Sequence, residues 1–319
     1  MAYTGTGDVS SDTAAFQQLA YFAFRSQPMY EMIADVRSTA QTHNGASVQF
    51  NIYDNMAQAT SALTEASDVT AVALGDSTVV VTLAEYGNAV ITTAKLRGTS
   101  FLNVDADAAN IIGYNMVDSV DKLVSNVANA GTNVIYAQGS MGSRPTSRVG
   151  IADAATFGAQ EGRQAVAELR TASAPGFDNG NYIGLVHPDV SYDLREQTAV
   201  TDVIQYQIRQ EGAAVRNGSI GVFGGIEWIE NPRAPILDDA GATSTTNVYQ
   251  TLVAGRQALA KAFSRAPGFG EDPSVVFGPV TDTLRRFHPV GWYHLVGHAI
   301  FRQAALQRIE SSSSIGDNT

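Results

Sequence analysis

Residues 103–129 contain no proline and carry apolar residues at helical spacing, which predicts one long amphipathic helix. Asp105 and Asp107 fall in its first turn, where the helix dipole favours negative charge. Gly131 stands where a left-handed cap would end the helix. A single polar residue interrupts the apolar stripe, which consists of Val104, Ala108, Ile111, Ile112, Asn115, Met116, Val120, Leu123, Val124 and Val127. The fold must therefore accommodate one long helix.

Strand patterns and a long loop precede this helix. Val48–Tyr53 alternates apolar and polar residues, as a half-buried strand does, and residues 79–83 form a second strand pattern. Leu63–Ala66 also has strand character. Residues 56–77 are rich in Ala, Thr and Ser and contain few large apolar residues. We expect a long exposed hairpin that is poorly stable alone and becomes ordered against another surface.

The remaining elements mix without regular alternation, which favours an α+β fold over a doubly wound sheet. Helical spacing is predicted at residues 13–25, 29–36, 153–172, 188–197 and 200–211. Strands are predicted at residues 181–187, 248–254 and 292–301, and a glycine-bent strand pair at 219–230. Residues 264–289 are rich in loops and carry four prolines, residues 302–310 end in a short helix or strand, and residues 311–319 form a polar tail.

Composition excludes several classes of protein. The chain has 319 residues, with a net charge of −11, 16% charged residues and no cysteine. The acidity argues against broad contact with nucleic-acid phosphates. The lack of cysteine excludes disulfides, zinc knuckles and thiol nucleophiles. No apolar run reaches the roughly 18 residues that span a bilayer, and the start of the sequence does not resemble a signal peptide. We expect no cofactor and no membrane partner, and synthesis in the cytoplasm.

Several segments, taken in order, resemble the tailed-bacteriophage major capsid proteins of the Hong Kong 97-type fold. They are Leu63-Thr-Glu-Ala, Glu85-Tyr-Gly, the strand and helix through Ala130, Tyr182-Ile-Gly-Leu-Val-His-Pro, Gly221-Val-Phe-Gly-Gly-Ile-Glu-Trp and Gly291-Trp-Tyr-His-Leu-Val-Gly-His-Ala. The resemblance covers most of residues 45–310, and its specificity comes from the ordered set of segments. It implies a structural protein, not an enzyme.

The resemblance also implies a division of the chain. Residues 1–45 would be an N-terminal arm, and residues 46–150 a peripheral domain with an extended loop at about 56–77 and a spine helix at 103–129. Residues 151–263 would form an axial domain. Residues 264–310 would return to the peripheral domain, before the tail at 311–319.

In such a protein, copies would form pentamers and hexamers and then an icosahedral shell that encloses viral double-stranded DNA without sequence-specific binding. The shell would assemble in the host cytoplasm and become the virion capsid, with portal, scaffolding and decoration proteins as candidate partners. The type member joins its subunits through a lysine on the extended loop. Because residues 56–77 contain no lysine, we expect non-covalent assembly. Because the arm begins almost at once, any scaffold would be a separate protein.

Charged residues supply the candidate contacts between subunits. Glu65, Asp68 and Asp76 of the loop are expected to meet arginines of a neighbour, such as Arg97 or Arg144. The alternative is that these loop charges are simply solvated. The basic pair Arg285 and Arg286 is too short for a nucleic-acid patch, and it is a further candidate for salt bridges between subunits.

Two other functions remain open from the sequence. An encapsulin-like compartment shares the Hong Kong 97-type fold but packages protein cargo. A metal-dependent hydrolase would use His288, His294 and His298, two of which are four residues apart. The glutamate of a His-Glu-x-x-His motif is absent, however, and a packed strand explains the same spacing. We therefore assign no catalytic or metal-binding residue.

Overall fold

The computed structural model describes residues 29–36, 45–53, 55–63, 65, 68–100, 104–177, 179–196, 219–264, 270–277, 282–284 and 286–315. The predicted helices at 13–25 and 200–211 lie outside these residues. The described residues divide into two compact units, one from Gly87–Met116 with Ser274–Tyr293 and one from the rest. Mixed helices and strands confirm the α+β class.

A small sheet and two helices make up the first unit. Its central strand is the first half of β13 (Phe287–Ile300), which pairs antiparallel with β12 (Ser274–Phe277) and also pairs with β4 (Ala84–Thr93). Helix α1 (Ala94–Thr99) follows β4, and its first turn is capped by the Thr93 hydroxyl, which accepts a hydrogen bond from Leu96 N at 3.2 Å. The residues predicted as loop-rich thus include a strand, β12.

The predicted long helix is confirmed as α2 (Val104–Ala128), which begins in the first unit. Asn115, the polar interruption in its apolar stripe, accepts hydrogen bonds from the Trp292 indole at 2.9 Å and from the Asn88 amide at 3.2 Å. A buried indole N–H needs an acceptor, so Asn115 stands at this position for a structural reason. The interruption is therefore part of the packing between α2 and the sheet.

The end of α2 differs from the prediction. Gly131 does not adopt a left-handed φ. Instead, the guanidinium of Arg308 donates to the carbonyls of Asn129 and Gly131, which satisfies groups that the helix end leaves free. A larger residue would fit tightly here, because a Cβ at this position would lie 3.1 Å from the Leu306 side chain.

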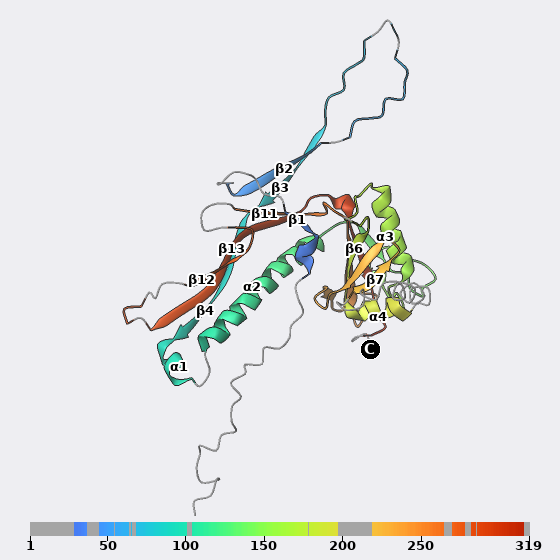
Figure 1. Cartoon of the computed structure of the whole chain (residues 1–319). Helices are drawn as coiled ribbons and strands as arrows, with labels where there is room; N and C mark the ends of the chain where they lie inside the picture. The colour runs from blue at the N-terminus through green and yellow to red at the C-terminus, as the bar shows by residue number, and fades with distance from the viewer. Residues whose placement is uncertain are drawn as a thin grey trace, which may run out of the picture. The chain divides into compact units, whose positions relative to one another are not determined.

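A seven-stranded sheet forms the core of the second unit (Figure 1). The strand order is β5-β14-β10-β6-β8-β7, and β9 also pairs with β10. The strands are β5 (Val134–Tyr136), β6 (Tyr182–Val186), β7 (Ser219–Phe223), β8 (Ile226–Glu230), β9 (Ile236–Leu237), β10 (Val248–Ala254) and β14 (Leu306–Ser311). The predicted strands at 181–187 and 248–254 and the strand pair at 219–230 are confirmed. The strands of this sheet come from all three predicted domain ranges, 46–150, 151–263 and 264–310. The boundaries of those domains stay predictions.

Two helices pack with this sheet. Helix α4 (Pro188–Glu196) confirms the helix predicted at 188–197 in its described part. Helix α3 (Ala159–Thr171) starts later than the predicted residue 153, because Glu161 caps it by accepting from Gly158 N at 3.1 Å. Its buried face contacts the core around Trp228, whose ring stands edge-on to Phe157 at 5.5 Å between centroids.

The N-terminal described segment joins a second group of strands in this unit. Residues 29–36, predicted to be helical, form a 3₁₀ turn η2 (Tyr30–Ile33) and a short strand β1 (Ala34–Val36). Strand β1 pairs in parallel with β11 (Leu259–Phe263), which pairs antiparallel with the second half of β13. The spacing of apolar residues fits a helix, but residues 34–36 form a strand because they hydrogen-bond to the neighbouring strand β11.

Strands β2 (Ser47–Tyr53) and β3 (Asp76–Thr82) form a two-stranded ribbon, which confirms both predicted strands (Figure 1). Val48 and Val81 are buried against Ala260 and Ala262 of β11, so the base of the ribbon is fixed to the unit. Leu63 and Glu65 are not in a strand, contrary to the expectation for Leu63–Ala66.

Residues 311–313 do not extend as the predicted polar tail, whereas Ser314 and Ile315 are exposed. Ser311 ends β14, and Ser311, Ser312 and Ser313 are almost completely buried. The hydroxyl of Ser312 donates to Asp153 O at 2.9 Å and that of Ser313 to Asp189 O at 3.0 Å. Serine can be buried when its hydroxyl is hydrogen-bonded, so this serine run packs against the unit instead of extending into solvent. Shorter 3₁₀ turns occur at η3 (Arg148–Gly150) and η4 (Gln303–Ala305).

Candidate functional site

Within the described residues, the loop between β2 and β3 exposes several large apolar side chains. Met56, Leu63, Val69, Val72 and Leu74 are each between 58% and 76% exposed. Figure 1 shows the loop continuing outward from the ribbon. Clusters of exposed apolar residues mark interaction surfaces, and a two-stranded ribbon is weak alone. This loop is therefore the first candidate contact surface, and it falls within the predicted 56–77.

Charge on this part of the chain has one sign. Residues 38–94 contain five carboxylates, at positions 54, 65, 68, 76 and 85, and no lysine or arginine. Glu65, Asp68 and Asp76 are exposed, and Asp68 accepts a hydrogen bond from its neighbour Val69 N at 2.8 Å. A surface that receives the loop must therefore be neutral or basic. Counting charges along the sequence would have shown this property.

The predicted partners Arg97 and Arg144 already have carboxylate partners within the chain. Arg97 Nε lies 2.5 Å from Asp105 Oδ2, and this contact joins α1 to the first turn of α2. The hydrogen bond from Arg97 holds the pKa of the Asp105 carboxyl below its usual value. Arg144 lies 3.5 Å from the buried Glu161. Both arginines are occupied by contacts that hold the subunit together.

Arg286 is also paired within the chain, whereas Arg285 lies outside the described residues. Asp282 Oδ1 accepts from Arg286 N at 2.6 Å, and its Oδ2 lies 3.3 Å from Arg286 Nε. This pair orders a turn beside Phe277 and Leu284, which are each 73% exposed. The end of the β12–β13 hairpin is thus a second exposed apolar surface, which the sequence reasoning missed.

Several basic side chains make no ion pair within the described part of the chain. Arg302 donates to the carbonyls of Ala172 and Ser173 instead, whereas four others are exposed, namely Lys95, Lys122, Arg163 and Arg170. Arg163 and Arg170 are exposed on α3, seven residues apart and therefore on one side of the helix. These four cations are available to carboxylates of another subunit, and sequence alone could not distinguish them from the paired arginines.

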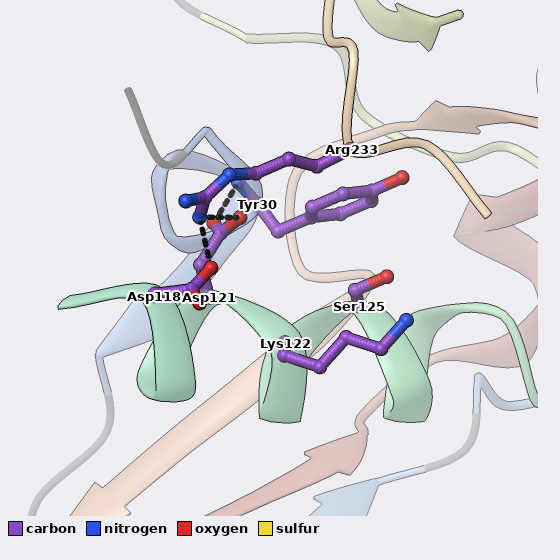
Figure 2. A pocket seen from close by; sticks show the side chains of 6 residues that line it. All are labelled: Tyr30, Asp118, Asp121, Lys122, Ser125 and Arg233. Atoms are coloured by element: carbon purple, nitrogen blue, oxygen red, sulfur yellow. Dashed lines mark hydrogen bonds and ion pairs between the residues drawn. The ribbon is translucent and has the colours of Figure 1, made fainter. Parts of the chain in front are cut away.

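A polar pocket of about 250 Å³ lies where the N-terminal described segment meets α2 (Figure 2). The buried carboxylate of Asp121 accepts from Tyr30 N at 2.7 Å, and Arg233 lies 2.7 Å from Asp118 and 3.7 Å from Asp121. Burial raises the pKa of Asp121, although the hydrogen bond from Tyr30 N acts against it. Lys122 and Ser125 line the same pocket. The cluster fixes residue 30 to the helix.

The three histidines of the hydrolase alternative do not form a metal site. His294 and His298 lie on the second half of β13, where His294 is only 3% exposed. Within the described residues, no three His, Cys, Asp or Glu side chains are placed to hold a metal ion. The packed-strand interpretation therefore fits the structure better.

No helix among the described residues is both long enough and apolar enough to cross a lipid bilayer.

Comparison with known families and structures addresses the whole chain. A sequence model of the family described as phage capsid protein matches residues 6–310. Comparison with curated protein sequences finds no match. Among solved structures, the capsid of Ralstonia phage GP4 is similar at a TM-score of 0.75 and 14% identity, over 99% of each chain.

Two further structures agree in fold. The capsid of cyanophage Pam1 aligns at a TM-score of 0.73 and 13% identity, over 99% of this chain and 100% of its own. The capsid of Helicobacter pylori bacteriophage KHP30 aligns at a TM-score of 0.73 and 12% identity, over 98% and 99%. At these identities the likeness concerns the fold, and it is of Hong Kong 97 type.

Proposed function

Because the chain belongs to the phage capsid protein family, we propose that its copies form pentamers and hexamers that close into an icosahedral shell around viral double-stranded DNA. Members of this family are structural proteins, and self-assembly into the shell is the function of the chain. Neither the encapsulin-like compartment nor the hydrolase gains support from the fold or the comparisons. The proposal therefore concerns how the copies hold one another.

The exposed loop at residues 55–75 is the observation that carries the proposal. Each apolar side chain that becomes covered gains about 25 cal/mol per Å² of surface removed from water. Five large apolar side chains on one loop are more than a soluble monomer needs there. We propose that the loop lies across a neighbouring subunit and that its burial helps to hold the capsomer together. The absence of lysine at 56–77 supports non-covalent contacts.

The charges suggest where such contacts lie. Glu65, Asp68 and Asp76 would face cations of a neighbour. Lys95, Lys122, Arg163 and Arg170 need no rearrangement to take part, whereas Arg97, Arg144 and Arg286 would have to share a carboxylate that they already bind. Arg285 stays a candidate from sequence alone. Surface pairs of this kind select partners more than they add affinity.

The remaining partners follow from the role in the virion. We propose assembly in the host cytoplasm, with portal, scaffolding and decoration proteins as further partners. The net charge of −11 supports enclosure of DNA without broad phosphate contact or sequence-specific binding. Nucleic acid in purified particles would support this content, whereas a protein cargo would favour the encapsulin-like alternative.

Electron microscopy and light scattering of the purified chain test the proposal. We expect shells or capsomer rings from the wild type. The double variant Leu63→Ser with Val72→Ser should fold but lose assembly, because both side chains are exposed in the single chain. Val149→Ser is the matched control, since Val149 is 71% exposed outside the loop. Normal shells from the double variant would refute the role of the loop.

A further inference from the structure

Four ionisable side chains meet in the second unit, where residues 29–36 pair with β11. Lys261 of β11 is almost fully buried, and its ammonium group is paired with Glu31 of η2. In the antiparallel ladder, Lys261 lies directly opposite His298 of β13. His294 is four residues earlier on the same strand, and so on the same face.

The surroundings of both histidines favour the neutral form of the imidazole. Burial and then the charge of Lys261 lower the pKa of His294, and the same two causes lower that of His298 to about 4. Within the described residues, the buried Nε2 of His298 has no hydrogen-bond partner. Glu31 is the carboxylate that acts in the opposite direction on both rings, and the backbone of Gly270 and Glu271 does so for His294.

The attachment of residues 29–36 combines a short ladder, polar contacts and two buried side chains. Strand β1 contributes only three residues to its ladder with β11. Around it stand the Glu31–Lys261 pair, the hydrogen bond from Tyr30 N to Asp121, and the buried side chains of Tyr30 and Ile33, which belong to the main core. A change of charge beside Lys261 therefore acts on the edge of this segment, against the packing of Tyr30 and Ile33.

We propose that Glu31, Lys261, His294 and His298 form an acid-sensitive contact that releases residues 29–36 from β11 when the histidines are protonated. At neutral pH one positive and one negative charge balance. Protonation adds up to two positive charges beside Lys261, with Glu31 as the opposing carboxylate. Like charges in a poorly solvated site repel strongly, and detachment of the segment returns the rings to water. The proposal concerns the folded subunit and goes beyond its role in the shell.

Hydrogen exchange measured by mass spectrometry on the full chain tests this at about pH 7.5 and about pH 4.5. After correction for the intrinsic exchange rate, protection of residues 29–36 should fall by about tenfold or more at the lower pH. Protection of β10 should persist as the internal reference. The double variant His294→Gln with His298→Gln should keep residues 29–36 protected at both pH values.

Two controls separate the causes. His288→Gln, in the first unit, should behave like the wild type. The double variant still contains Glu31, so release in that variant would assign the effect to the carboxylate and overturn the proposal. Unchanged protection in the wild type, or parallel loss of protection in β10, would overturn it as well. If the double variant does not fold, His298→Gln alone should lower the midpoint pH of release, and an unchanged midpoint would count against the proposal.

Discussion

Replacement of Glu310 by glutamine should destabilise the second unit, because this carboxylate is the centre of a buried ionic cluster. Glu310 is fully buried, and Arg148 donates to its two oxygens at 2.8 and 2.6 Å. Arg308 Nε lies 2.9 Å from it, and the Gln250 amide donates at 3.2 Å. The cluster joins β14 to β10 and to the turn at η3.

The magnitude follows from which groups lose their partner. Removal of one member of a buried ion pair costs about 3–5 kcal/mol, mainly because a buried charge stays uncompensated. Arg148 is 37% exposed and can turn toward water, whereas Arg308 is only 11% exposed and cannot. Glutamine keeps the shape of the side chain and one acceptor oxygen. We therefore expect a loss of unfolding free energy at the lower end of this range, about 3 kcal/mol at neutral pH.

The effect should depend on pH in a defined direction. Burial acts to raise the pKa of Glu310, but the hydrogen bond from Arg148 and the charges of Arg308 and Arg148 outweigh it, so the pKa is below the usual 4.5. A carboxylate with a lowered folded-state pKa contributes its full stability above its unfolded-state pKa. That contribution is lost as the pH falls through the folded-state value. The difference between wild type and variant should therefore shrink at acidic pH.

Urea denaturation followed by circular dichroism measures this difference at about pH 7 and about pH 4. Glu65→Gln is the matched control, because Glu65 is exposed on the loop, and it should change stability by less than about 0.5 kcal/mol. A loss below about 1 kcal/mol for Glu310→Gln at neutral pH would show that the cluster is not a buried ionic centre. A difference that does not vary with pH would refute the assigned charge.

Two further substitutions test the packing. Gly184→Ala should lower the free energy of unfolding by about 1–3 kcal/mol, because its Cβ would lie 2.5 Å from the Trp228 ring. Gly142→Ala is the control and should be nearly neutral, because a Cβ there meets no atom within 4 Å. Thermal denaturation of both variants measures the difference. Asn115→Leu should lower the free energy of unfolding by about 1–3 kcal/mol, because the Trp292 indole loses its acceptor. A change in tryptophan fluorescence should accompany this loss. Unchanged stability would mean that the indole finds another acceptor.

Local patterns in the sequence predicted the long helix, the ribbon strands and most of the large sheet. Each of these elements has a clear period or a run of buried apolar residues, so its own sequence determines its type. The predictions are wrong where contacts with a segment distant in sequence determine the secondary structure or the burial of a residue. Residues 34–36 become a strand because β11 offers a ladder, and the serines at 311–313 are buried because carbonyls of Asp153 and Asp189 accept their hydroxyls.

The candidate contact residues were harder to predict for the same reason. Sequence shows that Arg97 and Arg144 are cations, but only the fold shows that Asp105 and Glu161 already bind them. The exposed hairpin end at Phe277 was missed because its apolar residues look like those of a buried strand. Exposure is a property of the packed subunit, so no local pattern reports it.

The one-sided charge of residues 38–94 disfavours contact between two copies of the exposed apolar loop. Two such loops from different copies would each carry carboxylates and no cation, so their direct contact is opposed by repulsion. Surfaces with free cations, such as Lys95, Lys122 and the α3 arginines, are not penalised in this way. If the loop lies on a neighbouring subunit as proposed, this repulsion would direct it to a different surface of that subunit, and contacts between unlike surfaces are what a closed ring needs.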